Sequence, residues 1–244
     1  MNQRSYLQST ALFRNTGLDI YTMKFCDAAL SYYANLHFNR PLPAGMAVMN
    51  PYHDPGTFGL CTKFFHKFYP DSRPRKVLLG INPGRFGSGT TGISFTDPIR
   101  LAVNCGIENA LVKKPELSSD FIYQMIDLCG GPQVFYQHYF VTAVSPLGFL
   151  KDGKNINYYD DPGLTRAALP FIVESMEGLI KLPIYRDLCF CIGEGKNYDF
   201  LFKMNEQHQW FGEIKALPHP RFIMQYKRKQ LERYLLVYKA ALGF

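Results

Sequence analysis

Several features that mark common classes of protein are absent from this chain of 244 residues. No apolar run approaches the roughly 20 residues that a membrane-spanning helix needs. Residues 1–6 lack the charged segment, apolar core and small-residue cleavage site of a secretory signal. We therefore expect an intracellular protein that contacts no membrane, located in the cytoplasm or nucleoid of a bacterium or in the nucleus of a eukaryote.

The motifs of nucleotide cofactors and of serine nucleophiles are also missing. Gly84, Gly87 and Gly89 do not form G-x-G-x-x-G, and no G-K-[ST] follows a glycine-rich loop. The G-x-S-x-G turn of serine hydrolases is absent as well. The sequence therefore predicts no cofactor and argues against a serine nucleophile.

Cysteine is sparse, and its spacing argues against metal centres. The six cysteines are scattered and include no C-x-x-C. Cys189 and Cys191 lie two apart in a strand-like run, so they point to one face of a sheet, which indicates buried thiols. No two histidines among His37, His66, His138 and His208 have zinc-site spacing. We expect no metal, no iron–sulfur cluster and no disulfide.

What the chain does contain is typical of a globular protein. Hydrophobic residues make up 47% of it and aromatic residues 15%. No internal repeat, low-complexity tract or interdomain linker is apparent. We expect a single domain over residues 1–244, with 1–20 as an N-terminal extension of little periodicity, and a monomer.

Positive charge is concentrated near the C-terminus. The net charge is +7, and six basic residues follow His219 against Glu232 alone: Arg221, Lys227, Arg228, Lys229, Arg233 and Lys239. A solvated helix face is the ordinary explanation of such a segment. The run from Gln225 to Lys229 also places Tyr226 among the charges, which suits contact with phosphates and bases.

Strands and helices alternate along the chain, which predicts a three-layer α/β/α sandwich with a central, mainly parallel four-stranded sheet. The predicted strands are 77–81, 139–144, 188–192 and 213–217. The predicted helices are 21–38, 58–68, 98–104, 121–129 (with Ser118, Ser119 and Asp120 as its cap), 162–182, 196–205 and 224–242. Residues 48–56 and 151–159 are interpreted as loops.

Four strand ends meet at one edge of such a sheet: Asn82, Ser145, Gly193 and His219. This edge is where open α/β sheets bind ligands. Asn82 can hold a water or a polar ligand atom but cannot act as a base. A simple glycine-rich turn after the strand is the alternative interpretation of residues 82–92.

Five segments, in this order, resemble one family: N-P-Y at 50–52, G-I-N-P-G-R-F-G at 80–87, T-G-I-S-F at 91–95, F-V-T-A-V-S-P-L at 140–147 and L-P-H-P-R at 217–221. They are similar to the single-strand-selective monofunctional uracil-DNA glycosylases, within the uracil-DNA glycosylase superfamily. The resemblance runs from about Val48 to the C-terminus. It implies an enzyme that flips a damaged base out of DNA and cleaves its N-glycosidic bond without cutting the strand.

The resemblance also assigns roles. Asn82 would hold the attacking water, and Phe95 would stack on the flipped base. Main-chain groups near Ile81 and Gly84 would border the pocket, and His219 would stabilise the negative charge on the leaving base. The DNA-binding segment would comprise Arg221, Phe222, Gln225, Lys227, Arg228 and Lys229, with Arg221 or Phe222 as the wedge.

Two positions depart from the family pattern or from related branches. Ala143 stands where the family usually places a base-reading asparagine, which leaves Thr142 or Ser145 to supply one hydrogen bond each. This predicts tolerance of bases such as xanthine or 5-hydroxymethyluracil. Asn82 stands where some branches have aspartate, which predicts a modest rate without a general base.

Two other classes of function stay open at this point. One is a module of the same fold that binds damaged or single-stranded DNA without cleaving it. The other is an enzyme acting on a small nucleoside, which would need no basic segment and would be insensitive to salt.

Overall fold

The structure is a computed structural model that describes residues 23–244. The N-terminal extension expected at 1–20, and the first two residues of the helix expected at 21–38, lie outside the described residues. The described part of that helix is α2 (Phe25–Ala34), which is shorter than predicted.

The predicted central sheet is confirmed. It contains four strands in the order β3 (Tyr139–Ala143), β2 (Arg75–Gly80), β6 (Ile184–Ile192) and β7 (Glu213–Leu217). Every neighbouring pair is parallel. The carboxyl ends of all four strands therefore meet at one edge of the sheet.

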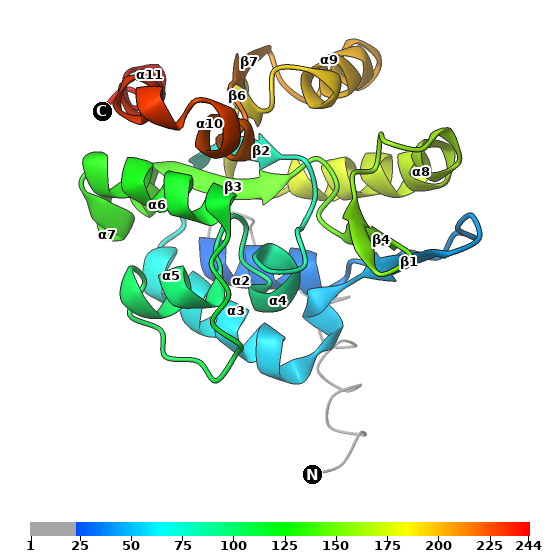
Figure 1. The fold of residues 1–244 in the computed structure, drawn as a ribbon, viewed down its shortest axis with the longest axis horizontal. Helices are drawn as coiled ribbons and strands as arrows, with labels where there is room; N and C mark the ends of the chain where they lie inside the picture. The colour runs from blue at the N-terminus through cyan, green and yellow to red at the C-terminus, as the bar shows by residue number, and fades with distance from the viewer. Residues whose placement is uncertain (1–22) are drawn as a thin grey trace.

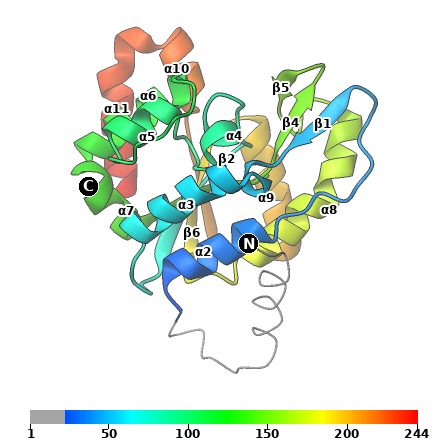
Figure 2. The ribbon, with the colours of Figure 1, turned by 90° about the horizontal axis from the view of Figure 1, so that it is seen from below.

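Helices cover both faces, which confirms the three-layer architecture (Figures 1 and 2). One face carries α6 (Leu117–Leu128), α7 (Gly131–His138) and α11 (Leu231–Leu242), and the other carries α8 (Pro162–Leu179) and α9 (Lys196–His208). Helices α2 and α3 (Pro55–Phe68) pack on the edge strand β3, where Phe25, Phe65 and Tyr69 surround Phe140.

Aspartate caps set the start of three helices, in each case before a proline at the first helical position. Asp97 caps α5 (Pro98–Val103) and Asp161 caps α8, and both helices begin at the predicted residue. Asp54 caps α3 by accepting a hydrogen bond from the Thr57 amide. This cap begins α3 three residues before the predicted start.

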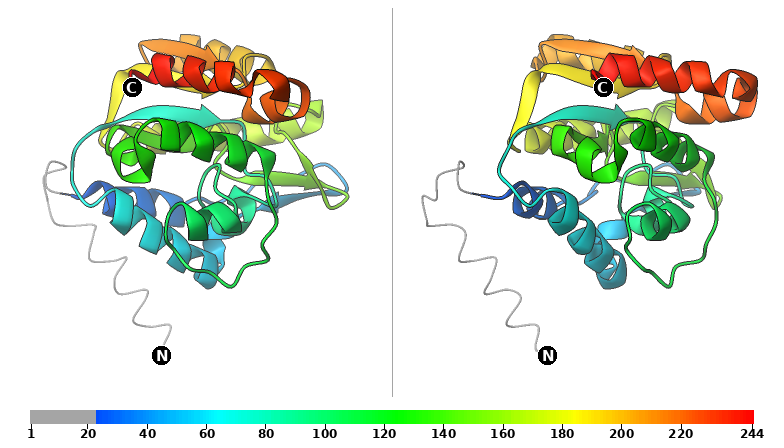
Figure 3. Two further views of the ribbon diagram at one scale, coloured as in Figure 1. Left: turned by 60° about the vertical axis from the view of Figure 1, so that its left-hand side comes forward. Right: turned by 90° about the vertical axis from the view of Figure 1, so that its left-hand side faces the viewer.

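Three helical predictions were wrong in detail. Helix α6 begins at Leu117, so Ser118 and Ser119 lie buried in its first turn instead of capping it. Helix α7, which begins directly after Gly130, was not predicted. The predicted C-terminal helix is divided at Lys227 into α10 (Pro220–Tyr226), the short 3₁₀ helix η3 (Arg228–Gln230) and α11. Figure 3 shows α10 and α11 lying beside α6, on which they pack.

A second sheet extends into both segments that were interpreted as loops, 48–56 and 151–159. Strands β1 (Met46–Met49), β4 (Gly148–Lys151) and β5 (Lys154–Ile156) form a three-stranded antiparallel sheet. Asp152 and Gly153 connect β4 to β5 with φ angles of 49° and 72°. Positive φ at both central residues is the geometry of a tight hairpin turn, which Asp-Gly favours.

Two short helical segments complete the part of the chain that surrounds the strand ends. The 3₁₀ helix η2 (Pro51–His53) precedes α3, and α4 (Ser88–Thr91) follows the loop after β2. Within residues 23–244, none of the helices combines the length and the apolar character needed to cross a membrane.

Candidate active site

A cleft of about 890 Å³ lies at the carboxyl ends of the parallel strands. Its walls come from the loops after β2, β6 and β7, from the end of β3, from the β4–β5 hairpin and from α10. The predicted site residues that line it are Ile81, Asn82, Gly84, Phe95, Thr142, Ala143, His219, Arg221, Phe222 and Gln225. The topology thus brings together residues from distant parts of the sequence.

Asn82 lies two residues after the end of β2, and the hairpin orients its side chain. Its Oδ1 accepts a hydrogen bond from the Tyr158 amide at 3.2 Å, and its Nδ2 donates to the Ile156 carbonyl at 3.4 Å. These two contacts distinguish the oxygen end of the amide from its nitrogen end. Asn82 Nδ2 also donates to the Pro83 carbonyl at 3.4 Å, so the side chain keeps a second lone pair on Oδ1 with which it can accept a hydrogen bond from a polar molecule in the cleft.

Asn197, at the start of α9, joins the ends of two strands beside Asn82. Its Nδ2 donates to the Ile192 carbonyl of β6 at 3.3 Å and to the Gly80 carbonyl of β2 at 3.5 Å, and its Oδ1 accepts a hydrogen bond from the Tyr158 hydroxyl at 2.8 Å. The side chain is buried although it borders the cleft. Sequence reasoning missed Asn197, because it looks like an ordinary helix residue without the tertiary contacts.

Phe95 presents an aromatic ring to the cleft from a left-handed backbone conformation, with φ of 52°. Such a conformation is uncommon for a bulky residue and often marks a functional constraint. Its ring centre lies 6.4 Å from that of His219. The two rings are therefore not stacked on each other, and both residues line the cleft.

His219 ends the loop after β7 and caps α10. Its Nδ1 accepts a hydrogen bond from the Arg221 amide at 3.2 Å, so in the neutral ring the proton is on Nε2. Burial, helped by the positive charge of Arg221, lowers the pKa of His219 to about 4. The imidazole is thus neutral at physiological pH and offers one N–H donor.

Residues 142–145 lie at the end of β3 and differ in what they present. Ala143 lines the cleft with a methyl group. Thr142 also lines it, and its hydroxyl accepts a hydrogen bond from the Tyr33 hydroxyl at 2.9 Å. The predicted contact through Ser145 is wrong: its side chain is fully buried outside the cleft and donates to the Leu147 carbonyl at 2.8 Å. The Ser145 amide donates to the Ile81 carbonyl, so the backbone at residue 145 still runs beside the chain after β2, and the Ser145 side chain stays in the interior.

Helix α10 forms one wall of the cleft with Arg221, Phe222, Gln225 and Tyr226. Phe222 is 45% exposed and Tyr226 72%, and their ring centres lie 5.7 Å apart. The predicted residues Lys227, Arg228 and Lys229 follow at the end of α10 and in η3 but do not line the cleft. The basic segment therefore flanks the opening.

Glu116 is a cleft residue that sequence reasoning missed. Its carboxylate lies against the loop after β2, so that a β-carbon added to Gly87 would meet its Oε2 at 2.0 Å. Burial, reinforced by the charge of Asp97 and opposed by Arg221, raises the pKa of Glu116 to about 7. A carboxyl group that titrates near neutral pH therefore lines a cleft with basic flanks.

The hairpin contributes three further cleft residues that sequence reasoning missed: Asn155, Asn157 and Tyr159. The Asp152–Gly153 turn was the signal that could have placed them, because Asp-Gly between short strands indicates a hairpin. The hairpin would then have been expected to project its polar residues beside the strand ends.

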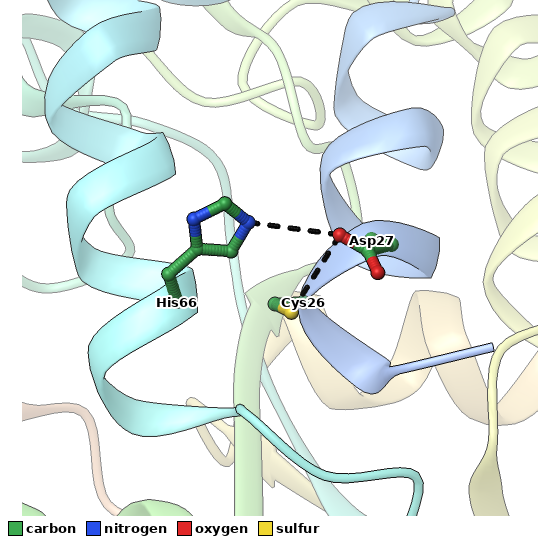
Figure 4. A group of neighbouring side chains, drawn as sticks. All are labelled: Cys26, Asp27 and His66. Carbon is green, nitrogen blue, oxygen red and sulfur yellow. Dashed lines mark hydrogen bonds and ion pairs between the residues drawn. The ribbon is translucent and has the colours of Figure 1, made fainter.

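A cluster of potential metal ligands lies away from this cleft, on α2 and α3 (Figure 4). Asp27 Oδ1 lies 3.6 Å from His66 Nε2 and 3.7 Å from Cys26 Sγ. Burial and the neighbouring Asp27 raise the pKa of the Cys26 thiol, which disfavours the thiolate that binds metals. None of the three residues lines the cleft.

Comparisons with known proteins agree with this geometry. Residues 66–243 match the family described as the uracil DNA glycosylase superfamily. A solved structure described as wild-type SMUG2 of Pedobacter heparinus superposes with a TM-score of 0.87 at 43% identity, covering 90% of this chain and 97% of that one.

Curated relatives match over a shorter stretch. The single-strand selective monofunctional uracil-DNA glycosylases of Rattus norvegicus and Mus musculus are 32% and 31% identical over 121 residues. The match covers 42% of this chain in both cases, and 44% and 43% of those proteins, so the chain matches less than half the length of these relatives. On the family match and the shared fold, the chain belongs to the uracil-DNA glycosylase superfamily and, within it, to the SMUG-like family.

Proposed function

We propose that this protein is a monofunctional DNA glycosylase that releases uracil from DNA and leaves an abasic site, the first step of base excision repair. The observation that carries the proposal is the meeting of Asn82, Phe95 and His219 in one cleft at the carboxyl ends of the sheet. These residues offer a polar site for water, an aromatic face and a hydrogen-bond donor. Enzymatic hydrolysis of an N-glycosidic bond can use all three, to position the water, to hold the base and to stabilise the charge on the leaving group.

In the proposed reaction, Asn82 positions a water whose oxygen attacks C1′ of the sugar. The bond from C1′ to the base nitrogen breaks, and its electron pair leaves with the base. The water proton passes to solvent as the new C1′ hydroxyl forms. Because Asn82 cannot accept that proton as a base, its contribution is positional.

His219 would stabilise the leaving base. Its neutral imidazole keeps Nε2–H free, since Nδ1 is occupied by the Arg221 amide. That N–H can donate to the carbonyl oxygen of the base on which negative charge develops. In other enzymes, removing one such hydrogen-bond donor slows the reaction by about 10²–10³-fold. Phe95 would hold the flipped base by stacking.

Flipping the nucleotide requires that something replace it in the stack. Helix α10 presents Arg221 and Phe222 beside the pocket, and the exposed Phe222 ring has the shape of such a wedge. Lys227, Arg228 and Lys229 follow it and would contact phosphates. The proposed site comes entirely from one chain, so we expect a monomer to be active and to act inside the cell, where DNA is found.

The proposed substrate range extends beyond uracil. Ala143 presents only a methyl group where a base-reading asparagine would supply a paired donor and acceptor, and Thr142 already accepts a hydrogen bond from Tyr33. Fewer fixed polar groups penalise the wrong base less. We therefore expect release of xanthine or 5-hydroxymethyluracil in addition to uracil.

The test is base release from labelled single- and double-stranded oligonucleotides that carry uracil, xanthine or 5-hydroxymethyluracil, with hot alkali to reveal abasic sites. Asn82→Ala and His219→Ala are each expected to slow single-turnover release about 100-fold or more. Lys63→Ala, on the exposed surface of α3, is the control that should behave as wild type. Salt-sensitive DNA binding without release of any base would leave a damage-binding module instead.

A further inference from the structure

A second aromatic and basic patch borders the cleft, apart from α10. Phe86 is 39% exposed, and both Phe86 and Arg85 line the cleft. The guanidinium carbon of Arg85 lies 4.5 Å from the centre of the Phe86 ring, and Lys114 Nζ lies 4.7 Å from it. We call Arg85, Phe86 and Lys114 the Phe86 patch.

The cations of the Phe86 patch are available to an external anion. Within residues 23–244, neither Arg85 nor Lys114 forms an ion pair with a carboxylate. Both side chains are exposed. Both cations lie over the Phe86 ring, so a base that stacks on the ring takes the place of one of them, and the displaced cation can then bind a neighbouring phosphate.

The hairpin holds the patch in place. The Arg85 amide donates to Asn155 Oδ1 at 3.2 Å, and its Nη1 donates to the Gly153 carbonyl at 2.7 Å. The loop is also closed on itself, because the Gly87 amide donates to the Gly84 carbonyl at 3.1 Å. Phe86 is therefore presented by an anchored loop, which lowers the entropy lost on binding.

The patch and α10 offer the same chemistry at two places on one cleft. On α10, Phe222 lies 5.7 Å from Tyr226 and 6.0 Å from Lys227 Nζ. Figure 2 shows α10 and the β4–β5 hairpin on either side of the loop that leads into α4. The residues proposed to act on the flipped nucleotide lie on the same cleft.

We propose that the Phe86 patch is a second contact for single-stranded DNA, in which a base next to the flipped nucleotide stacks on Phe86 and a phosphate binds Arg85 and Lys114. The strand would then be held on both sides of the reacting nucleotide, by the patch and by α10. This proposal rests on the proposed function for the identity of the strand. Its chemistry is that of sequence-independent single-strand binding, which combines stacking with phosphate contacts.

The test measures binding of a fluorescein-labelled oligothymidylate that carries no lesion, by anisotropy over a range of NaCl concentrations. Lys114→Gln removes one charge. We expect the negative slope of log K against log[salt] to become less steep by about 0.7, the value for one phosphate contact on a single strand. Phe86→Leu keeps apolar volume but removes the ring, and we expect about tenfold weaker binding with an unchanged salt slope.

Two further variants make the result specific. Lys63→Gln, on α3 and outside the cleft, is the matched charge control and should bind as wild type. Lys227→Gln tests the proposed DNA contact at the end of α10. If Lys227→Gln weakens binding while Lys114→Gln and Phe86→Leu bind as wild type, the Phe86 patch is not a DNA contact, although the proposed function stands. Base release is assayed separately, so its absence would overturn the proposed function even if all patch variants bind as expected.

Discussion

The ring of Phe95 lies directly against the α-carbon of Gly80. A β-carbon built on Gly80 would lie 2.8 Å from two carbons of that ring, closer than real β-carbons approach their neighbours. Gly80 ends β2, two residues before Asn82. The absence of a side chain at residue 80 therefore makes room for the aromatic face of the cleft.

Gly80→Ala is expected to displace the Phe95 ring and to slow base release sharply. Overpacking of this kind typically costs about 1–3 kcal/mol of unfolding free energy. The ring is partly exposed and can move toward the cleft, so we expect a cost near the lower end and a larger effect on activity. Urea unfolding and single-turnover release, measured on the same preparation, separate the two effects.

Gly59→Ala is the matched control. Gly59 lies inside α3, and a β-carbon there would meet nothing within 4 Å. Alanine favours a helix over glycine by about 1 kcal/mol. The variant should be at least as stable as wild type and fully active. A loss of activity in Gly59→Ala equal to that in Gly80→Ala would argue against a specific role for the Gly80–Phe95 contact.

His219 is expected to stay neutral throughout the physiological pH range. Its pKa is lowered to about 4, so between pH 4 and its ordinary value of 6.5 the unfolded chain binds more protons than the folded protein. The contribution of His219 to stability is therefore complete above pH 6.5 and is lost as pH falls toward 4. Nitrogen NMR of the imidazoles, assigned with His219→Gln, checks this. A His219 titration near pH 6.5 would contradict the buried, neutral donor.

Glu116 should make DNA binding weaken as pH rises through about 7. Its pKa is raised to about 7 from an ordinary 4.5, with Asp97 and Arg221 as the charged groups that face it. Above pH 7 the carboxylate is ionised and repels phosphates at the cleft. Glu116→Gln should bind DNA more tightly than wild type at pH 8 and similarly at pH 5.5, as measured by anisotropy.

The free energy of unfolding should also depend on the ionisation of Glu116. Between pH 4.5 and about 7 the folded protein holds a proton on Glu116 that the unfolded chain has lost. The contribution of Glu116 to the free energy of unfolding therefore decreases as pH rises from 4.5 to about 7. Glu116→Gln should be more stable than wild type at pH 8.

As a control, Glu194→Gln removes an exposed carboxylate from the same cleft and should leave the pH dependence of DNA binding as it is in wild type.

Ala143→Asn is expected to sharpen selectivity. An asparagine at the end of β3 would add a donor and an acceptor to the cleft wall beside Thr142. The ratio of uracil release to xanthine release should rise by about tenfold or more, because a mismatched base would leave a polar group unpaired. Competition between the two lesions in one reaction measures this ratio. Equal ratios for the variant and wild type would show that residue 143 does not read the base.

The local signals in the sequence predicted the frame of the molecule. The apolar runs before Asn82 and after Leu188 form buried parallel strands, and the range predicted for β7, 213–217, is the one observed. The helices predicted to start at residues 98 and 162 do so, after the caps Asp97 and Asp161. These features depend on residues within a few positions of one another, and their physical causes act through the local backbone.

A glycine-rich loop, an aromatic residue and a histidine that follow the strands of a parallel sheet could be predicted from the sequence, because buried strands and breaking residues are local signals. The surroundings of these residues could not be predicted, because they depend on tertiary contacts. The cleft positions of Glu116 and Asn197, and the burial of Ser145, depend on contacts between residues far apart in the chain. The orientation of Asn82 likewise depends on the hairpin at 148–156 and the residues that follow it.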